Sequence, residues 1–133
     1  MSKNKPVTTQ LSAAQITDII AGYASDKKAI DLVDVDLTGI SGYTDHFVIC
    51  SGNTARQVKA IHDGIYIGVK NDHGLLPRRV EGLPEGHWVL MDYFDVVVHI
   101  FTPDTRDYYR LEQLWGEAPR RSIESTPDEA DDV

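Results

Sequence analysis

Residues 44–58, which read TDHFVICSGNTARQV, carry the sharpest structural signal in the chain. The run 47–50 is continuously apolar, as expected of an interior strand. Residues 51–53 break that strand, and Thr54 with Gln57 has the form of a capping box at the start of a helix. Apolar residues then recur at helical spacing until Gly74, which is well placed to end the helix: Val58, Ile61, Ile65 and Val69. This stretch predicts a strand, a tight turn and a helix of about 54–72.

The segment before residue 44 predicts one more helix and one more strand. Ser12 and Gln15 form a second capping box, which predicts a helix over 13–26. Alternating apolar and polar residues predict a strand over 29–36.

The downstream segment adds three strands and a helix. We expect a brief strand at 79–81, followed by strands at 88–91 and 96–101 that pair as a hairpin. Pro103 opens a last helix that carries Tyr108, with Leu111 and Trp115 facing the core. The order of elements predicts an α/β fold, a mixed β-sheet packed with helices. The portion around 47–80 could supply a right-handed parallel crossover.

The composition favours one small domain. The chain has 133 residues, of which 41% are hydrophobic and 26% are charged. We expect a flexible N-terminus over residues 1–10, a single α/β domain over 11–116 and an acidic disordered tail over 117–133. No apolar run approaches the roughly 20 residues of a membrane-spanning helix, and residues 1–10 resemble neither a signal peptide nor a transit peptide. We therefore expect a cytoplasmic protein with no membrane partner.

The net charge restricts the partners. Thirteen basic and 21 acidic residues give a formal charge of −8. Phosphates repel a body this acidic, so we expect no direct specific binding of nucleic acid. The same charge suits docking on a basic protein.

The histidines and the cysteine do not predict a metal site or another cofactor. No two histidines stand three or four residues apart, the spacing that places two ligands on one helical face: His46, His62, His73, His87 and His99. His99 lies in an apolar strand, which favours a neutral core histidine, whereas His62 and His73 are expected to face solvent. The lone Cys50 follows apolar residues and is expected to be a buried thiol.

Asp34 and Asp36 form the one pair of carboxylates with the spacing of a magnesium site on a strand. We interpret them as solvated carboxylates at a strand end. The alternative is a degenerate or active Mg²⁺-dependent nucleotidyltransferase that uses both and binds phosphate at the turn 51–53. No basic cluster accompanies that turn, and the carboxylates precede it in the chain.

A linked set of motifs over about 30–115 resembles the Iojap family, whose bacterial members are ribosomal silencing factors. The set begins with Thr44-Asp45, the strand 47–49 and Ser51-Gly52-Asn53 with Arg56. It continues with Glu81-Gly82, Trp88, the run 92–101 (DYFDVVVHIF), Arg106, Tyr109, Leu111-Glu112 and Leu114-Trp115. Phe94 departs from the pattern, because many relatives carry glycine or another small residue there.

This resemblance implies a nucleotidyltransferase-like fold that lacks the catalytic set, and therefore a protein that is not an enzyme. It implies a translation repressor that binds the large ribosomal subunit through its ribosomal protein fourteen and sterically blocks subunit joining. Such a protein could be a monomer or a homodimer in solution, since an apolar sheet face could pair two copies.

The candidate partner-binding residues are aromatic and acidic. Trp88, Tyr93 and Tyr108 are aromatic anchors if they are exposed, and each could equally belong to the core. Four acids could meet Lys or Arg of a partner: Glu81, Asp92, Asp95 and Glu112. Asp92 and Asp95 could instead mark a turn, and Glu112 could instead bind the ring of His99.

Overall fold

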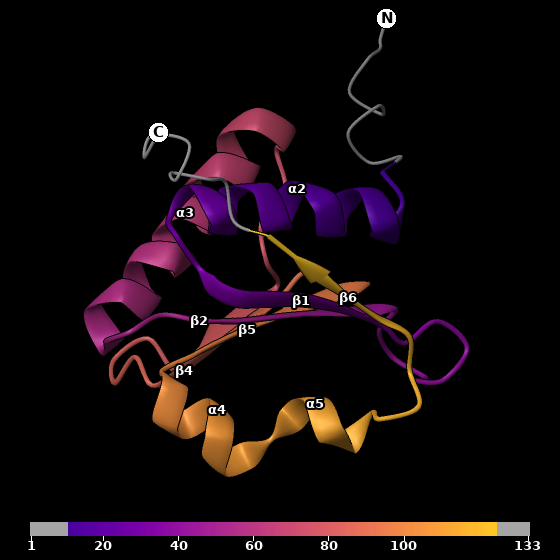
Figure 1. Ribbon diagram of the computed structural model, residues 1–133. Coiled ribbons are helices and arrows are strands. Elements are labelled where there is room, and N and C mark those ends of the chain that lie inside the picture. Colours follow the sequence, from indigo (N-terminus) through magenta and orange to yellow (C-terminus); the bar gives the residue numbers. More distant parts are fainter. Residues whose placement is uncertain (1–10, 125–133) are drawn as a thin grey trace, which may run out of the picture.

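The computed structural model describes residues 11–124, which form a six-stranded mixed sheet with helices on both faces (Figure 1). The order across the sheet is β3-β4-β5-β2-β1-β6. Strands β2 and β5 are parallel, whereas the other neighbouring pairs are antiparallel. The strands are β1 (Ile30–Asp36), β2 (His46–Ser51), β3 (Arg79–Glu81), β4 (Trp88–Asp92), β5 (Val96–Phe101) and β6 (Arg120–Ile123). The predicted mixed α/β fold is confirmed.

Two layers of helix enclose the sheet. Helices α2 (Ala13–Asp26) and α3 (Ala55–His73) lie on one face, and α4 (Pro103–Tyr109) and α5 (Leu111–Leu114) lie on the other (Figure 1). Because α3 follows β2 and α4 follows β5, the chain leaves the two parallel strands towards opposite faces. No helix in the described part of the chain has the length and apolar character that a membrane span requires.

The ends of the two long helices are fixed locally. The Ser12 hydroxyl accepts a hydrogen bond from the Gln15 amide at 3.1 Å, and the Gln15 side chain accepts one from the Ser12 amide at 2.8 Å. At α3 the Thr54 hydroxyl caps the Gln57 amide, but the Gln57 side chain donates to the carbonyl of Lys27 instead. Gly74, with φ of 69°, ends α3. Both helix predictions are confirmed, and at α3 a tertiary contact replaces half of the capping box predicted for Thr54 and Gln57.

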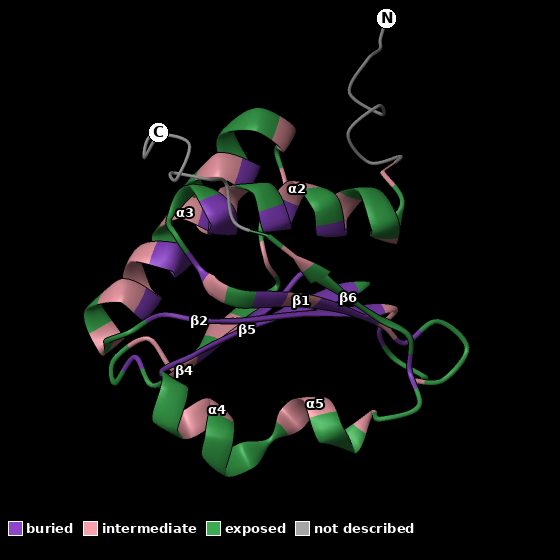
Figure 2. Ribbon diagram, in the orientation of Figure 1, coloured by how far each residue is buried: buried purple, intermediate pink, exposed green. Residues whose placement is uncertain are grey.

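The sheet separates two apolar clusters. Strands β2 and β5 are buried at every position, as Figure 2 shows for the centre of the sheet. The larger cluster lies beneath α2 and α3 and contains Cys50, whose burial is confirmed. The smaller one lies on the α4–α5 side, where Leu111 and Trp115 pack against it as predicted. Its buried members are Val35, Leu37, Phe47, Ile49, Val97, Phe101 and Ala118.

The last predicted helix is interrupted. Arg110 has φ of 47°, so the chain turns there and separates α4 from α5. Arg106 reaches across the break and binds both carboxylate oxygens of Glu112, at 3.2 and 2.6 Å. The turn thus allows an ion pair across the break while Leu111 and Trp115 still reach the smaller cluster.

The predicted disordered tail is wrong for residues 117–124. Strand β6 pairs antiparallel with β1, and Ala118 is buried in the smaller cluster. Arg121 binds Asp34 at 3.2 Å and Asp18 at 2.9 Å, which ties β6 to β1 and α2. Residues 1–10 and 125–133 lie outside the described residues, so those parts of the domain prediction are untested.

The crossover differs in detail from the prediction. Strand β3 runs in the same direction as β2, but β4 and β5 lie between them in the sheet. The parallel neighbour of β2 is therefore β5, and the hairpin of β4 and β5 was predicted correctly.

Candidate functional site

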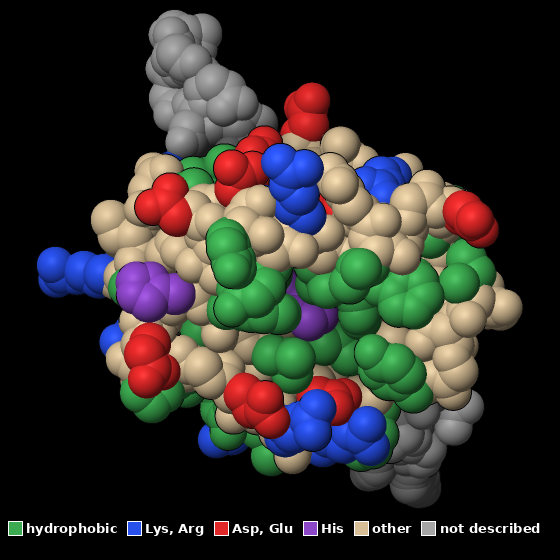
Figure 3. All heavy atoms as spheres, turned by 90° about the horizontal axis from the view of Figure 1, so that it is seen from below, with side chains coloured by type: hydrophobic (Ala, Val, Ile, Leu, Met, Phe, Trp, Pro, Cys, Tyr) green, Lys and Arg blue, Asp and Glu red, His purple; other side chains and the backbone are tan. Residues whose placement is uncertain are grey.

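The sheet face that carries α4 and α5 is only partly covered. Alternation along β4 and β5 places Trp88 opposite Phe101 and Leu90 opposite His99 on this face. Trp88 and Leu90 remain half-buried, and beside them α4 presents exposed rings. Seen from this side, hydrophobic side chains gather in one patch with charged groups around it (Figure 3). We define the aromatic face as four side chains of this patch that lie on β4 and α4: Trp88, Leu90, Tyr108 and Tyr109.

The rings of this face form a continuous series. The Trp88 ring lies 4.9 Å from the buried Phe101 ring and 4.8 Å from that of Tyr109. Tyr109 in turn packs edge-on against Tyr108 at 4.9 Å. Tyr108 is 79% exposed, so the series runs from the core to solvent. Rigid rings of this kind supply contact area with little loss of side-chain entropy on binding.

His99 lies beneath these rings and is neutral. The indole N–H of Trp88 donates to His99 Nδ1 at 3.1 Å, so the proton of the neutral ring is on Nε2. Burial lowers the pKa of His99 to about 4. Within the described residues, His99 Nε2 has no hydrogen-bond partner. The predicted neutral core histidine is confirmed, but its partner is Trp88 rather than Glu112.

Ion pairs occupy one edge of the face, near the turn between β4 and β5. The buried Asp92 carboxylate accepts a hydrogen bond from Arg78 Nε at 3.0 Å and one from the Phe94 amide at 2.8 Å. Arg79 lies 3.3 Å from the exposed Glu81 carboxylate and 3.9 Å from that of Asp92. Asp92 therefore organises the turn, as the alternative reading predicted.

The two aromatic residues after Asp92 have opposite environments. Tyr93 is 4% exposed and belongs to the larger cluster beneath α2 and α3, where burial raises the pKa of its hydroxyl. The alternative reading, in which Tyr93 belongs to the core, is therefore correct, and Tyr93 does not lie on the aromatic face. Phe94 is exposed instead, with Arg78 stacked over its ring.

Of the other predicted partner-binding residues, Trp88 and Tyr108 lie on the aromatic face, and Asp95 is exposed in the β4–β5 turn. Sequence reasoning did not assign Leu90 or Tyr109 to the site. The signal for Leu90 was its two-residue spacing from Trp88 on one strand, which places both on one face.

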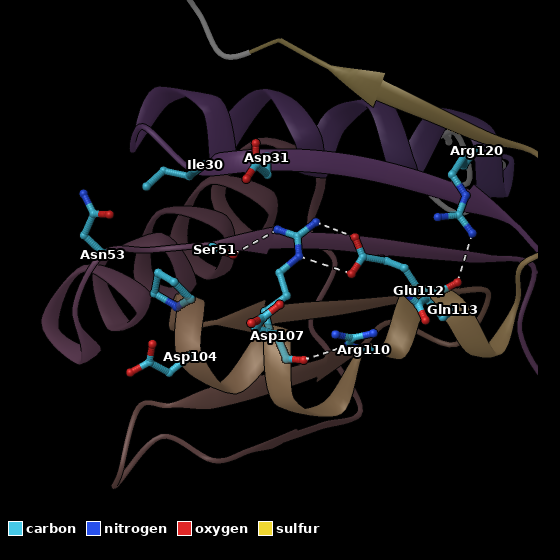
Figure 4. Close-up of a pocket in the computed structure, with 12 residues that line it drawn as sticks. Ile30, Asp31, Ser51, Asn53, Asp104, Asp107, Arg110, Glu112, Gln113 and Arg120 are labelled. Carbon is cyan, nitrogen blue, oxygen red and sulfur yellow. Dashed lines mark hydrogen bonds and ion pairs between the residues drawn. The ribbon is translucent and has the colours of Figure 1, made fainter.

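A cavity of about 770 Å³ opens where β2 and β5 end (Figure 4). Arg106 projects into it and joins Ser51 of β2, at 2.9 Å, to Glu112 of α5. Burial raises the pKa of Glu112, but the hydrogen bonds and charge of Arg106 outweigh this, and the pKa is lowered. Arg120 donates to the Glu112 carbonyl at 2.9 Å. Glu112 therefore connects α4, α5 and the strand β6.

Asp34 and Asp36 do not line this cavity. The buried Asp34 carboxylate binds His46 Nδ1 at 2.7 Å and Arg121 at 3.2 Å, so the prediction that it is solvated is wrong. Asp36 accepts a hydrogen bond from the Thr38 amide at 2.9 Å, and the hydrogen bonds of Thr38 lower its pKa. The two carboxylates thus have separate partners, an arrangement that does not favour the nucleotidyltransferase alternative.

Two further predictions concern histidine and cysteine. His62 is buried and its Nδ1 lies 2.9 Å from the Asp63 carboxylate, so the prediction that it faces solvent is wrong. Burial raises the pKa of the Cys50 thiol to about 12. Across residues 11–124, no three His, Cys, Asp or Glu side chains are grouped in a way that could hold a metal ion.

The architecture is that of a mixed α/β protein with one sheet face left partly open, and solved structures share the α/β fold. A crystal structure of a protein from Chromobacterium violaceum superposes with a TM-score of 0.77 at 30% identity, over 88% of this chain and 98% of that one. The family model described as "Ribosomal silencing factor during starvation" matches residues 10–133. A protein of Bacillus subtilis named "Ribosomal silencing factor RsfS" is 41% identical over 114 residues, which are 86% of this chain and 96% of that protein.

The chain therefore belongs to the ribosomal silencing factor family. A more distant relative is the mouse protein named "Mitochondrial assembly of ribosomal large subunit protein 1", which is 30% identical over 103 residues. This chain covers 44% of that longer protein. The resemblance to the Iojap family is confirmed.

Proposed function

We propose that this protein docks on the large ribosomal subunit through the aromatic face, that its partner there is ribosomal protein fourteen, and that it blocks joining of the small subunit. The family and the name of the mouse relative support an association with the ribosome. Blocking by occupancy needs no reacting group, so the protein acts without enzymatic activity or a cofactor. Its place is the cytoplasm, where subunits meet.

The partly open aromatic face is the observation that carries this proposal. Its rings run from a buried strand to a side chain that is mostly in solvent, and charged groups lie along one edge. An apolar centre with a polar rim is the usual anatomy of a protein interface. The net charge of −8 complements a basic ribosomal protein.

The acidic residues divide into two roles. Glu81 and Asp95 are exposed, and Glu81 is paired with Arg79 only at the surface. These two residues meet basic groups of the partner. Asp92 and Glu112 are bound by Arg78 and Arg106, so they position the β4–β5 turn and the α4–α5 break. Charge reversal at Glu81 or Asp95 therefore weakens docking without unfolding the domain.

Subunit association followed by sucrose-gradient sedimentation tests the proposal. The unchanged protein should prevent formation of joined ribosomes in proportion to its ratio to large subunits, without ATP or GTP. Tyr108→Ala should weaken binding to large subunits by about tenfold or more, the size expected of an aromatic anchor. The matched control is Ile67→Ala, because Ile67 is also exposed but lies on α3, across the sheet.

Three results would contradict the proposal. Equal binding by the Tyr108 and Ile67 variants would show that the aromatic face is not part of the interface. Inactivation of ribosomes that persists after the protein is washed away would indicate chemistry rather than occupancy. Failure to bind purified ribosomal protein fourteen in calorimetry, together with intact binding to large subunits, would assign a different partner.

A further inference from the structure

We infer that Phe94, at the tip of the β4–β5 hairpin, is a specific contact residue for the docked partner and extends the aromatic face to the hairpin tip. This inference rests on the proposed function.

The backbone at Phe94 is strained. Its φ of 78° lies in the left-handed region, which glycine adopts freely and which a bulky side chain rarely adopts. Three hydrogen bonds hold the hairpin tip in this conformation. The Phe94 amide donates to Asp92 Oδ1 at 2.8 Å, the Tyr93 amide to the Val96 carbonyl at 2.8 Å, and the Asp95 amide to the Tyr93 carbonyl at 3.1 Å. A glycine or an asparagine would adopt the same turn with less strain.

Burial of the ring in the core does not offset this strain. Phe94 is 54% exposed and belongs to neither apolar cluster. Its recorded ring contact is the Arg78 guanidinium, 4.5 Å from the ring centroid. Arg78 is itself held by the Asp92 carboxylate at 3.0 Å. Arg78 therefore restricts one side of the ring while the other side is open to solvent, which favours binding because part of the side-chain freedom is already lost before contact.

The position of Phe94 joins it to the aromatic face. Trp88, Leu90 and Asp92 alternate along β4 and share the face that carries α4 and α5. Arg78 binds the Asp92 carboxylate, and the Phe94 ring stacks on Arg78. Arg78 and Phe94 therefore lie next to Asp92, at the end of β4 away from Trp88. A protein seated on the aromatic face would meet this pair at its edge. Residues with strained backbones cluster at functional sites, which supports a binding role for this exposed ring.

Paired measurements of stability and affinity test this inference. Phe94→Gly and Phe94→Asn should leave Tm equal to or above that of the unchanged protein, because both relieve the strain. Both should weaken binding to purified large ribosomal subunits by about tenfold, measured by cosedimentation over a range of concentrations. Ile67→Ala again serves as the control for loss of an exposed apolar side chain.

The outcomes separate this inference from the proposed function. Binding within twofold of the unchanged protein in both Phe94 variants would overturn the inference, and a weakened Tyr108→Ala variant in the same experiment would leave the proposed function standing. Normal binding by the Tyr108 variant as well would overturn both. A fall in Tm of several degrees in both Phe94 variants would show that the ring stabilises the fold, which also contradicts the inference.

Discussion

Lowering the pH from about 8 to about 5 should destabilise the domain by about 2 kcal/mol through His99 alone. The folded pKa of His99 is about 4, below the ordinary value of 6.5, because burial disfavours the charged ring. Between these two values the unfolded chain binds more protons than the folded one. The free energy of unfolding therefore falls as the pH drops below about 6.5, and this loss levels off below about 4.

The magnitude follows from the two pKa values. At about pH 5, the unfolded His99 is about 1.5 pH units below its pKa of 6.5, while the folded ring is still mostly neutral. At about 1.4 kcal/mol per unit, this gives about 2 kcal/mol, with a limit of about 3 kcal/mol at lower pH.

Urea unfolding followed by circular dichroism at a series of pH values measures this loss. His99→Gln is the matched variant, because a glutamine oxygen can accept the Trp88 indole hydrogen bond but does not titrate. The variant should lack the fall in stability between about pH 6.5 and pH 5. An identical pH dependence in both proteins, or a His99 pKa near 6.5 in an NMR titration of the folded protein, would refute the reasoning.

Four further variants test the fold. Truncation after Gly116 removes Ala118 and β6, so it should lower Tm by more than about 5 °C in a thermal melt. Truncation after Glu124 keeps the strand and is the control. Gly82→Ala should cost about 2 kcal/mol or more in urea unfolding, because φ is 91° and the added carbon would lie 2.0 Å from the Trp88 carbonyl oxygen. Gly22→Ala, with open space around it on α2, should instead stabilise by about 0.5–1 kcal/mol. Arg106→Ala should cost about 2 kcal/mol in the same assay, because it leaves Glu112 and Ser51 without their shared partner; unchanged stability would show that this ion pair is not structural.

The long helices and the central strands could be predicted from the sequence because short-range interactions define them. Ser12 caps a helix through a residue three positions away, and Thr54 does the same for α3. Gly74 ends α3 through its own backbone conformation. The apolar run of β2 reflects a strand that is buried at every position, and in β1 Leu32 and Val35 enter the clusters on opposite faces of the sheet. Each of these signals lies within a single helix or strand and needs no contact with a distant segment.

The candidate site was predictable only in part. Trp88 and Tyr108 were named as anchors, but the sequence could not decide which aromatic side chains were exposed. Tyr93 and Phe94 are adjacent and similar in size, yet one packs beneath the helices and the other lies in solvent. The hairpin turn, with its left-handed residue, separates them. Likewise, only the fold shows that Asp92 is bound by Arg78.

By itself, the sequence determined the family, through a linked set of motifs, and most of the helices and strands, through local periodicity. The tertiary structure alone decided the last strand and the exposure of the site. Residues 120–123 carry one large apolar side chain, so no local pattern predicts β6. They form a strand because β1 offers backbone groups to pair with, and because Arg121 meets Asp34 and Asp18, which are 87 and 103 residues away in the chain. Edge pairing and burial depend on contacts between distant segments, and these exist only once the sheet has formed.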